Sequence, residues 1–156
     1  MLKHVARVRE DTVRSVDILL IEDNPGDIRM TQEVLRRSIA GCSLTTIEDP
    51  EHALARLRGE SLPKMKPHVI FLDLNLPKIA GLDALEKIRQ TPGLEFVPIV
   101  VLSASENPEE IRKAYQRGAN CFIRKPAGLD DFMHAVTRCC EFWCNIVVLP
   151  PAEPGS

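Results

Sequence analysis

The sequence has no long apolar run and no strong charge of one sign, and each absence narrows its possible functions. None of its apolar runs approaches the roughly 20 residues that a membrane-spanning helix needs, so we expect no membrane partner. The formal net charge is only -2, which provides no basic field for nucleic acid. No apolar stretch follows the basic residues Lys3, Arg7 and Arg9, so no secretory signal is visible.

Cysteine is scarce and irregularly placed. The 5 cysteines form no C-x-x-C pair and have no disulfide-framework spacing, which predicts reduced thiols in a cytoplasmic protein. Cys139, Cys140 and Cys144 cluster in the sequence, but His134 is the only histidine near them. We therefore favour buried, small hydrophobic side chains over a metal site at these positions.

The length and composition indicate one globular domain. The chain has 156 residues, of which 44% are hydrophobic and 27% are charged, and this balance argues against disorder. Residues 1–15 have mixed charge without periodicity and are predicted to be an N-terminal extension. Residues 16–149 form the predicted domain and residues 150–156 a C-terminal tail, and we expect no output domain beyond it.

Apolar runs typical of strands alternate with helical stripes five times along the chain. This alternation predicts an α/β fold, a doubly wound (βα)5 parallel sheet with helices on both faces. The expected strands are 17–21, 43–47, 68–73, 97–102 and 121–123, and the expected helices are 28–39, 50–58, 82–91, 108–117 and 129–143.

Polar side chains with complementary chemistry follow four of these strands. Glu22 and Asp23 come after the first strand, Asp73 ends the third, Ser103 follows the fourth and Lys125 follows the fifth. Because the carboxyl ends of parallel strands share one edge of the sheet, we expect these side chains to lie together. A purely structural interpretation, in which Asn24 or Asp27 caps the next helix, explains at most one acid of the 22–27 stretch.

This set of side chains predicts a magnesium-dependent phosphoryl site. Mg²⁺ prefers oxygen ligands, so Asp23 and Asp73 are the expected direct ligands, with Glu22 acting through water and Asn75 offering a backbone carbonyl. Asp73 beside a cation is suited to attack phosphorus and form an aspartyl phosphate. Lys125 and the metal would neutralise the charge on the phosphoryl oxygens. The Ser103 hydroxyl and the Ala104 backbone N–H could hold one of those oxygens.

Four motifs make the sequence resemble the receiver domain of two-component response regulators over nearly its whole length. They are Glu22-Asp23, Asp73 with Leu76-Pro77 and Gly81, Ser103-Ala104, and Lys125-Pro126. The resemblance implies a flavodoxin-like fold with strand order 2-1-3-4-5. It also implies a signalling domain, not an enzyme, that assists its own phosphorylation and dephosphorylation.

The resemblance assigns further roles to individual residues. A sensor histidine kinase would donate a phosphoryl group to Asp73 in the presence of Mg²⁺, and Lys125 would contact that group. Ser103 and Phe122 would act as the switch, although Phe122 lacks the hydroxyl that a tyrosine would bring. The peptide bond before Pro126 would be cis. The stretches 21–27, 72–78, 119–126 and 142–151 also resemble stand-alone regulators paired with bacterial phytochromes, which implies a kinase of that type.

The last predicted helix carries more apolar residues than one buried face requires. Phe132, Val136 and Trp143 belong to one row, and a second apolar row and an apolar tail adjoin it. The simpler interpretation is that the stripe only covers the sheet. Excess apolar surface usually marks an interface, so we predict a symmetric homodimer through the fifth strand, the last helix and the tail.

Three other functions remain open from the sequence. A phosphatase or dehalogenase with an Asp nucleophile would need a second acid two residues after it, where this chain has Asn75. A nucleotide- or flavin-binding module would need a Gly-rich loop in place of Glu22 and Asp23. A phosphorylation-independent interaction module would not need the acids, all of which are present.

Overall fold

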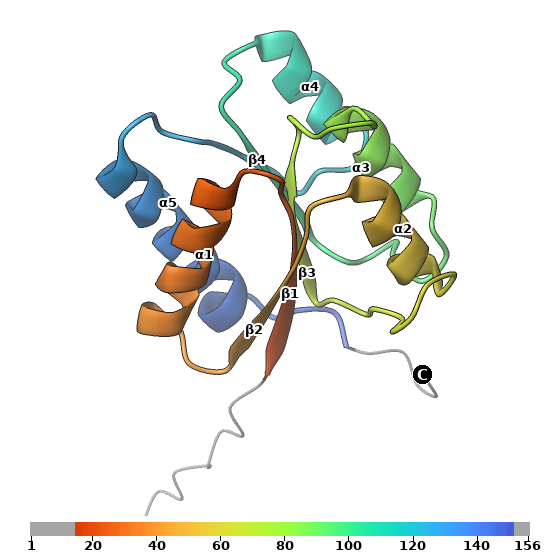
Figure 1. Ribbon diagram of the computed structural model, residues 1–156, viewed down its shortest axis with the longest axis horizontal. Coiled ribbons are helices and arrows are strands. Elements are labelled where there is room, and N and C mark those ends of the chain that lie inside the picture. Colours follow the sequence, from red (N-terminus) through yellow and green to blue (C-terminus); the bar gives the residue numbers. More distant parts are fainter. Residues whose placement is uncertain (1–14, 152–156) are drawn as a thin grey trace, which may run out of the picture.

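The computed structural model describes residues 15–151 and shows a single parallel sheet between two layers of helices (Figure 1). Most of the predicted extension 1–15 and residues 152–156 of the predicted tail lie outside the described residues. The five strands have the order β2-β1-β3-β4-β5, which confirms the predicted flavodoxin-like topology. The strands are β1 (Val16–Ile21), β2 (Cys42–Ile47), β3 (Val69–Asp73), β4 (Ile99–Ser103) and β5 (Cys121–Arg124). The helices are α1 (Pro25–Ser38), α2 (Pro50–Arg58), α3 (Gly81–Arg89), α4 (Pro108–Gln116) and α5 (Leu129–Glu141), followed by the π-helical turn η1 (Phe142–Ile146).

Three helices begin in the same way, directly after a strand. The side chains of Asn24, Asp49 and Asn107 accept backbone N–H groups of the first turns of α1, α2 and α4, and a proline follows each of these caps. Because the connections are short, each helix starts only a few residues after the strand that precedes it. They therefore place the first turns of these helices at the carboxyl edge of the sheet, beside the strand ends.

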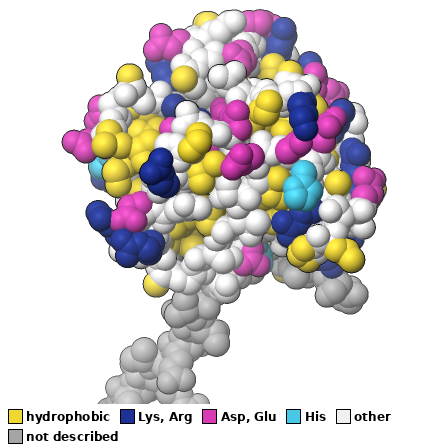
Figure 2. All heavy atoms as spheres, viewed as in Figure 1, with side chains coloured by type: hydrophobic (Ala, Val, Ile, Leu, Met, Phe, Trp, Pro, Cys, Tyr) yellow, Lys and Arg dark blue, Asp and Glu magenta, His cyan; other side chains and the backbone are white. Residues whose placement is uncertain are grey.

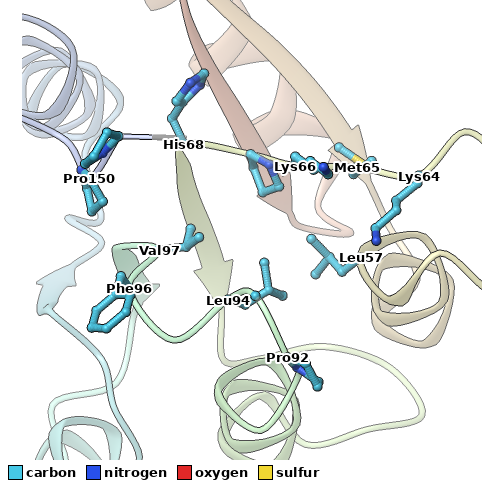
Figure 3. A pocket seen from close by; sticks show the side chains of 13 residues that line it. Leu57, Lys64, Met65, Lys66, His68, Pro92, Leu94, Phe96, Val97 and Pro150 are labelled. Atoms are coloured by element: carbon cyan, nitrogen blue, oxygen red, sulfur yellow. The ribbon is translucent and has the colours of Figure 1, made fainter. Parts of the chain in front are cut away.

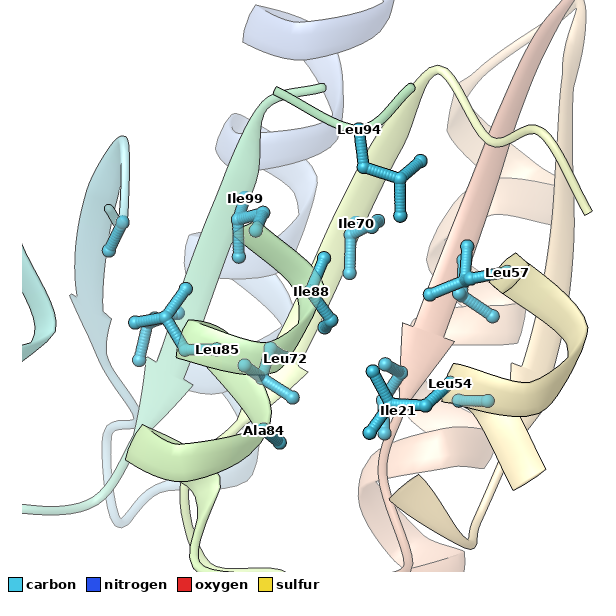
Figure 4. Close-up of a cluster of buried hydrophobic side chains, with 14 of the residues drawn as sticks. Ile21, Leu54, Leu57, Ile70, Leu72, Ala84, Leu85, Ile88, Leu94 and Ile99 are labelled. Carbon is cyan, nitrogen blue, oxygen red and sulfur yellow. The ribbon is translucent and has the colours of Figure 1, made fainter. Parts of the chain in front are cut away.

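The central strands β3 and β4 are buried along their whole length, and the core divides into two clusters on opposite faces of the sheet. Apolar side chains on both faces are expected of a parallel strand covered by helices on each side. One cluster lies under α2 and α3 (Figure 4) and includes Ile21, Leu54, Leu72, Leu85 and Ile88. The other lies under α1 and α5 and includes Val34, Leu35, Phe71, Phe132, Val136 and Cys140.

The row of α5 that was expected to form a dimer interface faces the core instead. Phe132 and Val136 are 4% and 2% exposed, and Trp143 is partly buried against the same cluster. The prediction that Phe132 and Val136 are interface residues is therefore wrong, because these two side chains cover the sheet within the subunit. Cys139 and Cys140 are buried there too, as predicted, and burial raises the pKa of both thiols.

The chain departs from a regular helix near its end. The helix predicted over 129–143 ends at Glu141 and continues as the π-helical turn Phe142–Ile146. The segment 147–151 then crosses toward the side of α2 and α3 (Figure 1), where Pro150 and Pro151 line a pocket with His68 just before β3, and Leu149 is only 4% exposed. This segment therefore joins the two helical layers at the sheet edge opposite the strand carboxyl ends.

A pocket with a volume of about 270 Å³ lies at this opposite edge (Figure 3). Its wall includes Leu57, Lys64, Lys66, Leu94, Phe96, Val97 and Pro150. None of the strand-end residues predicted for the phosphoryl site lines it.

Charge and hydropathy are mixed over the molecular surface. Acidic, basic and apolar side chains alternate on the face seen in Figure 2, where no field of one sign dominates. Within residues 15–151, none of the helices is both long and apolar enough to cross a lipid bilayer.

Candidate functional site

The three predicted acids meet at the carboxyl edge of the sheet. Glu22 and Asp23 follow β1, and Asp73 is the last residue of β3, whose Leu72 pairs with Ile21 of β1. One carboxylate oxygen of each acid lies within 4.8 Å of the others. Glu22 and Asp73 are 1% and 4% exposed, and Asp23 is partly exposed. Three carboxylates this close repel one another unless a cation lies between or beside them.

Lys125 supplies one such cation. Its Nζ lies 2.7 Å from Glu22 Oε2 and 2.8 Å from Asp27 Oδ2, and 3.6 Å from Asp73 Oδ1. The backbone N–H of Lys125 donates to the Ser103 carbonyl oxygen at 2.8 Å, so β4 fixes the place where the side chain leaves β5. The side chain is only 10% exposed, so these charges interact more strongly than they would on the open surface.

Burial and charge pairing together set the protonation of this cluster. Burial raises the pKa of Glu22 from its ordinary value of 4.5 to about 7, against the lowering effect of Lys125. Burial alone would lower the pKa of Lys125, but its hydrogen bonds to Asp27 and Glu22 outweigh that effect and raise it. The ammonium therefore stays charged at neutral pH, which is the state that neutralises a phosphoryl group.

Asp73 keeps one oxygen open for chemistry. Its Oδ1 accepts the backbone N–H of Asn75 at 3.1 Å and faces Lys125. Among the described residues, no hydrogen bond or ion pair reaches its Oδ2. The loop that carries Asn75 depends on Gly81, where an added Cβ would lie 2.2 Å from the Leu74 Cα. The backbones of Gly81 and Leu74 are therefore too close for any residue other than glycine at position 81.

The donor set fits a hard divalent cation. All three acids offer oxygen, and among the described residues neither the Asp23 carboxylate nor Asp73 Oδ2 is engaged by a hydrogen bond or an ion pair, so both can bind such an ion. Both Glu22 oxygens are already engaged, Oε1 by the Asn24 backbone N–H at 3.0 Å and Oε2 by Lys125. Whether Glu22 acts on a metal through water therefore stays a prediction, with both of its oxygens held by protein groups.

The remaining predicted residues lie at the same edge but make different contacts. Ser103 ends β4 and is 3% exposed, and its hydroxyl accepts the Ser105 backbone N–H at 3.2 Å. Ala104 follows it and is exposed. Phe122 is partly buried on β5, and its backbone N–H donates to the Tyr115 hydroxyl at 3.1 Å. The α4 residue Tyr115 therefore brings a hydroxyl to the backbone of Phe122.

Two features of the site differ from the sequence-based expectations. The cis peptide bond of the described chain is Leu62–Pro63, and the bond between Lys125 and Pro126 is trans, so the prediction of a cis bond there is wrong. Any X–Pro bond allows both isomers at a small energy difference, so tertiary context decides between them.

The second difference is Asp27, which was considered only as a helix cap. The cap is Asn24, which accepts the Gly26 and Asp27 N–H groups at 2.9 and 3.1 Å. The Asp27 carboxylate is thereby left to bind Lys125. The sequence feature that could have indicated this role is the position of Asp27 in the first turn of a helix that starts at the site.

Comparison with known proteins agrees with this geometry. Residues 18–137 match the family model described as the response regulator receiver domain. The chain is 39% identical over 137 residues to the response regulator Rcp1 of Synechocystis, covering 86% of this chain and 93% of that protein. It is 32% identical over 131 residues to a probable methanogenesis regulatory protein, FilR2, of Methanothrix harundinacea, covering 81% of this chain and 82% of that protein.

Solved structures extend the likeness to three dimensions. The Mn²⁺-bound form of Rcp1 matches with a TM-score of 0.82 at 38% identity, covering 87% of this chain and 99% of that one. The phosphorylated cyanobacterial phytochrome response regulator RcpA matches with a TM-score of 0.83 at 39% identity, with the same coverage. With its strand order, its acid cluster and its lysine at the expected strand ends, the chain belongs to the response regulator receiver domain family.

Proposed function

We propose that the protein is a single-domain response regulator that accepts a phosphoryl group on Asp73 from a histidine kinase. The observation that carries this proposal is a buried aspartate with one open oxygen that lies beside two further acids and 3.6 Å from the Lys125 ammonium. The Asp73 oxygen would form a bond to phosphorus as the phosphorus–nitrogen bond to the kinase histidine breaks. The electron pair of that bond returns to the imidazole nitrogen.

Different residues would hold the metal ion and neutralise the phosphoryl group during this transfer. Asp23 and Asp73 would hold Mg²⁺, with Glu22 acting through water and the Asn75 carbonyl as a further ligand. The ion, when bound, supplies positive charge to the phosphoryl oxygens. Lys125, whose Nζ lies 3.6 Å from Asp73 Oδ1, supplies a second positive charge.

Ser103 and Ala104 are proposed to hold a phosphoryl oxygen once transfer has occurred. The Ser103 hydroxyl would then exchange its present bond to the Ser105 N–H for the phosphoryl group. Because Ser103 and Phe122 lie on adjacent strands, this movement would alter the packing of Phe122 and its link to Tyr115 of α4. Phosphorylation is thereby passed to the surface formed by α4 and β5.

A signalling role fits the site better than enzymatic turnover. An Asp-nucleophile hydrolase needs an acid two residues beyond the nucleophile, and Asn75 at that place is exposed and cannot donate or accept a proton in this way. The phosphoryl group would therefore remain on Asp73 long enough to be read by a partner.

The kinase partner is proposed to be a phytochrome-type sensor in the cytoplasm. Similarity to Rcp1 and to the phytochrome response regulator RcpA supports this partner. The test is transfer of a radiolabelled phosphoryl group from a phosphorylated phytochrome kinase to this chain, with Asp73→Asn as the site control. We expect label on the wild type within the first time points and none on the variant. Faster labelling by unrelated histidine kinases would contradict the assignment of the partner.

We also propose a homodimer, through the end of the last helix and the chain that follows it, which are part of the expected surface, and without Phe132 and Val136. Around η1 the side chains of Phe142, Ile146 and Val148 are 44%, 69% and 91% exposed. Three large apolar side chains within seven residues make an apolar surface that water contacts unfavourably. Pairing two such surfaces about a twofold axis would bury them, with Phe132 and Val136 remaining in the core of each subunit.

A further inference from the structure

The Lys125 ammonium is shared between more carboxylates than the phosphoryl chemistry requires. Its two short contacts go to Glu22 and Asp27, at 2.7 and 2.8 Å, while the phosphoacceptor Asp73 lies at 3.6 Å. An ammonium has three hydrogen-bond donors and no acceptor. In this state two of the three donors are therefore held by residues other than the phosphoacceptor.

Asp27 is held in place for this contact by its position in α1. Asn24 caps the helix, so the Asp27 carboxylate is not needed for the backbone N–H groups of the first turn. The Asp27 side chain is 20% exposed and lies within hydrogen-bonding distance of a lysine that is 10% exposed. A charge-assisted hydrogen bond in such a setting is stronger than a pair on the open surface.

The carboxylates of Glu22 and Asp27, which make the two short contacts with Lys125, would be left in different environments if the ammonium moved away. The Glu22 side chain is 2% exposed, so a Glu22 carboxylate without its lysine would be a buried and poorly paired charge. The Asp27 side chain is more exposed, so water can take the place of the ammonium there. When a phosphoryl group on Asp73 attracts Lys125, Asp27 is thus the partner that is released at lower cost.

We propose that Asp27 is a positioning residue that binds the Lys125 ammonium in the unphosphorylated protein and competes with the phosphoryl group for it. This inference rests on the proposed phosphorylation of Asp73. It adds a structural consequence, because exchange of the Asp27 contact for a phosphoryl contact also loosens the link between α1 and the segment after β5. Phosphorylation would then be sensed on the α1 side of the site as well as at Phe122.

The competition predicts a tighter complex with a phosphoryl mimic when the Asp27 charge is removed. In the presence of Mg²⁺, we expect Asp27→Asn to bind beryllofluoride about threefold to tenfold more tightly than the wild type, since Lys125 no longer has to leave a carboxylate. Asp27→Glu, which restores the carboxylate, should return the affinity toward that of the wild type. Titrations followed by NMR give these affinities directly.

A matched control separates this contact from the general loss of one negative charge. Glu106 lines the same pocket as Asp27 and Lys125, but its side chain is 76% exposed and pairs with Arg124 at 3.5 Å. Glu106→Gln removes the same charge without touching Lys125, and we expect a change of less than twofold in beryllofluoride affinity.

A second readout needs neither metal nor phosphoryl mimic. In protein labelled with ¹⁵N-lysine, the Lys125 ammonium signal, assigned by its loss in Lys125→Gln, should shift in Asp27→Asn and stay in place in Glu106→Gln. An unchanged Lys125 signal in Asp27→Asn would overturn the inference, as would equal beryllofluoride affinities for Asp27→Asn, Glu106→Gln and the wild type. Failure of the wild type itself to bind beryllofluoride would instead overturn the proposed function on which the inference rests.

Discussion

Glu22 carries a negative charge that its buried position disfavours. Its side chain is buried beside Asp73, and among residues 15–151 its carboxylate is compensated by Lys125 and the Asn24 N–H alone. Burial raises its pKa to about 7, whereas the same group in the unfolded chain has its ordinary value of 4.5. Between these two values the folded protein holds a proton that the unfolded chain has lost. Stability from this group is therefore full below pH 4.5 and falls as the pH rises toward 7.

The pH dependence can be tested with Glu22→Gln, which cannot ionise. Measured by urea unfolding in a chelator, the variant should gain free energy of unfolding relative to the wild type as the pH rises from about 5 to about 8, by roughly 3 kcal/mol at most. The exposed Glu60→Gln, which removes a carboxyl group outside the site, serves as a control and should not show this gain. A difference between Glu22→Gln and the wild type that does not change with pH would contradict this account.

The residues of the site were predictable from the sequence only where the fold class alone decides their place. Asp73 and Lys125 follow strands of one parallel sheet, so their meeting at one edge follows from the alternation of strands and helices. Asp27 and Tyr115 depend on how a helix is turned about its axis and on which side chain takes the cap. Those are tertiary facts that a single sequence does not contain, and both contacts were missed.

At the scale of elements, Arg89 at the end of α3 connects segments that no strand pairing joins. Its Nε donates to the Gly118 carbonyl at 2.8 Å, and its Nη1 donates to the Leu94 and Val97 carbonyls at 3.1 and 2.6 Å. Its Nη2 donates to Asn120 Oδ1 at 2.6 Å. The loops before β4 and β5 are therefore held to α3 by one guanidinium group.

Replacing this guanidinium should destabilise the fold without touching the phosphoryl site. A lysine has the charge but not the planar set of donors, so Arg89→Lys should lower the free energy of unfolding by about 2 kcal/mol. Urea unfolding measures the loss. Arg36→Lys, at an exposed arginine paired with Glu33, should change it by less than about 0.5 kcal/mol. Equal effects of the two substitutions would show that the Arg89 contacts do not stabilise the protein.

The helix α5 shows where a periodic pattern stops being informative. Its apolar positions correctly indicated a helix that covers the sheet, but the pattern could not tell which row would face inward. Phe132 and Val136 are in the core, whereas Phe142 and Ile146 are exposed, and the helix changes to a π-helical turn after Glu141. A change in helical repeat rotates every later side chain, and propensities alone do not locate it.

At the scale of the whole molecule, the phosphoryl site and the exposed apolar side chains lie in different parts of the same subunit. The acids and Lys125 lie at the carboxyl ends of the strands. Phe142 and Ile146 belong to η1, which follows α5, and Val148 comes two residues later. Association through the second region would leave Asp73 open to a kinase. A dimer would thus be compatible with phosphorylation of both subunits.

Sedimentation velocity at micromolar concentration tests this association. We expect the wild type to sediment as a dimer, and Ile146→Glu to weaken the dimer by at least about tenfold because it places a charge among apolar side chains. Leu62 is also a large exposed apolar residue, at 84%, so Leu62→Glu is the matched control and should remain dimeric. A wild type that sediments as a monomer would contradict the proposed dimer.

The most direct test of the central claim is the mass of the intact protein after incubation with Mg²⁺ and acetyl phosphate. We predict an added mass of one phosphoryl group on the wild type, none on Asp73→Asn, and an unchanged adduct on Asp83→Asn, an exposed aspartate of α3. The adduct should map to Asp73 and disappear when a chelator removes the metal before the reaction. A wild type that gains no phosphoryl mass with Mg²⁺ present, or an adduct that persists in Asp73→Asn, would contradict the account.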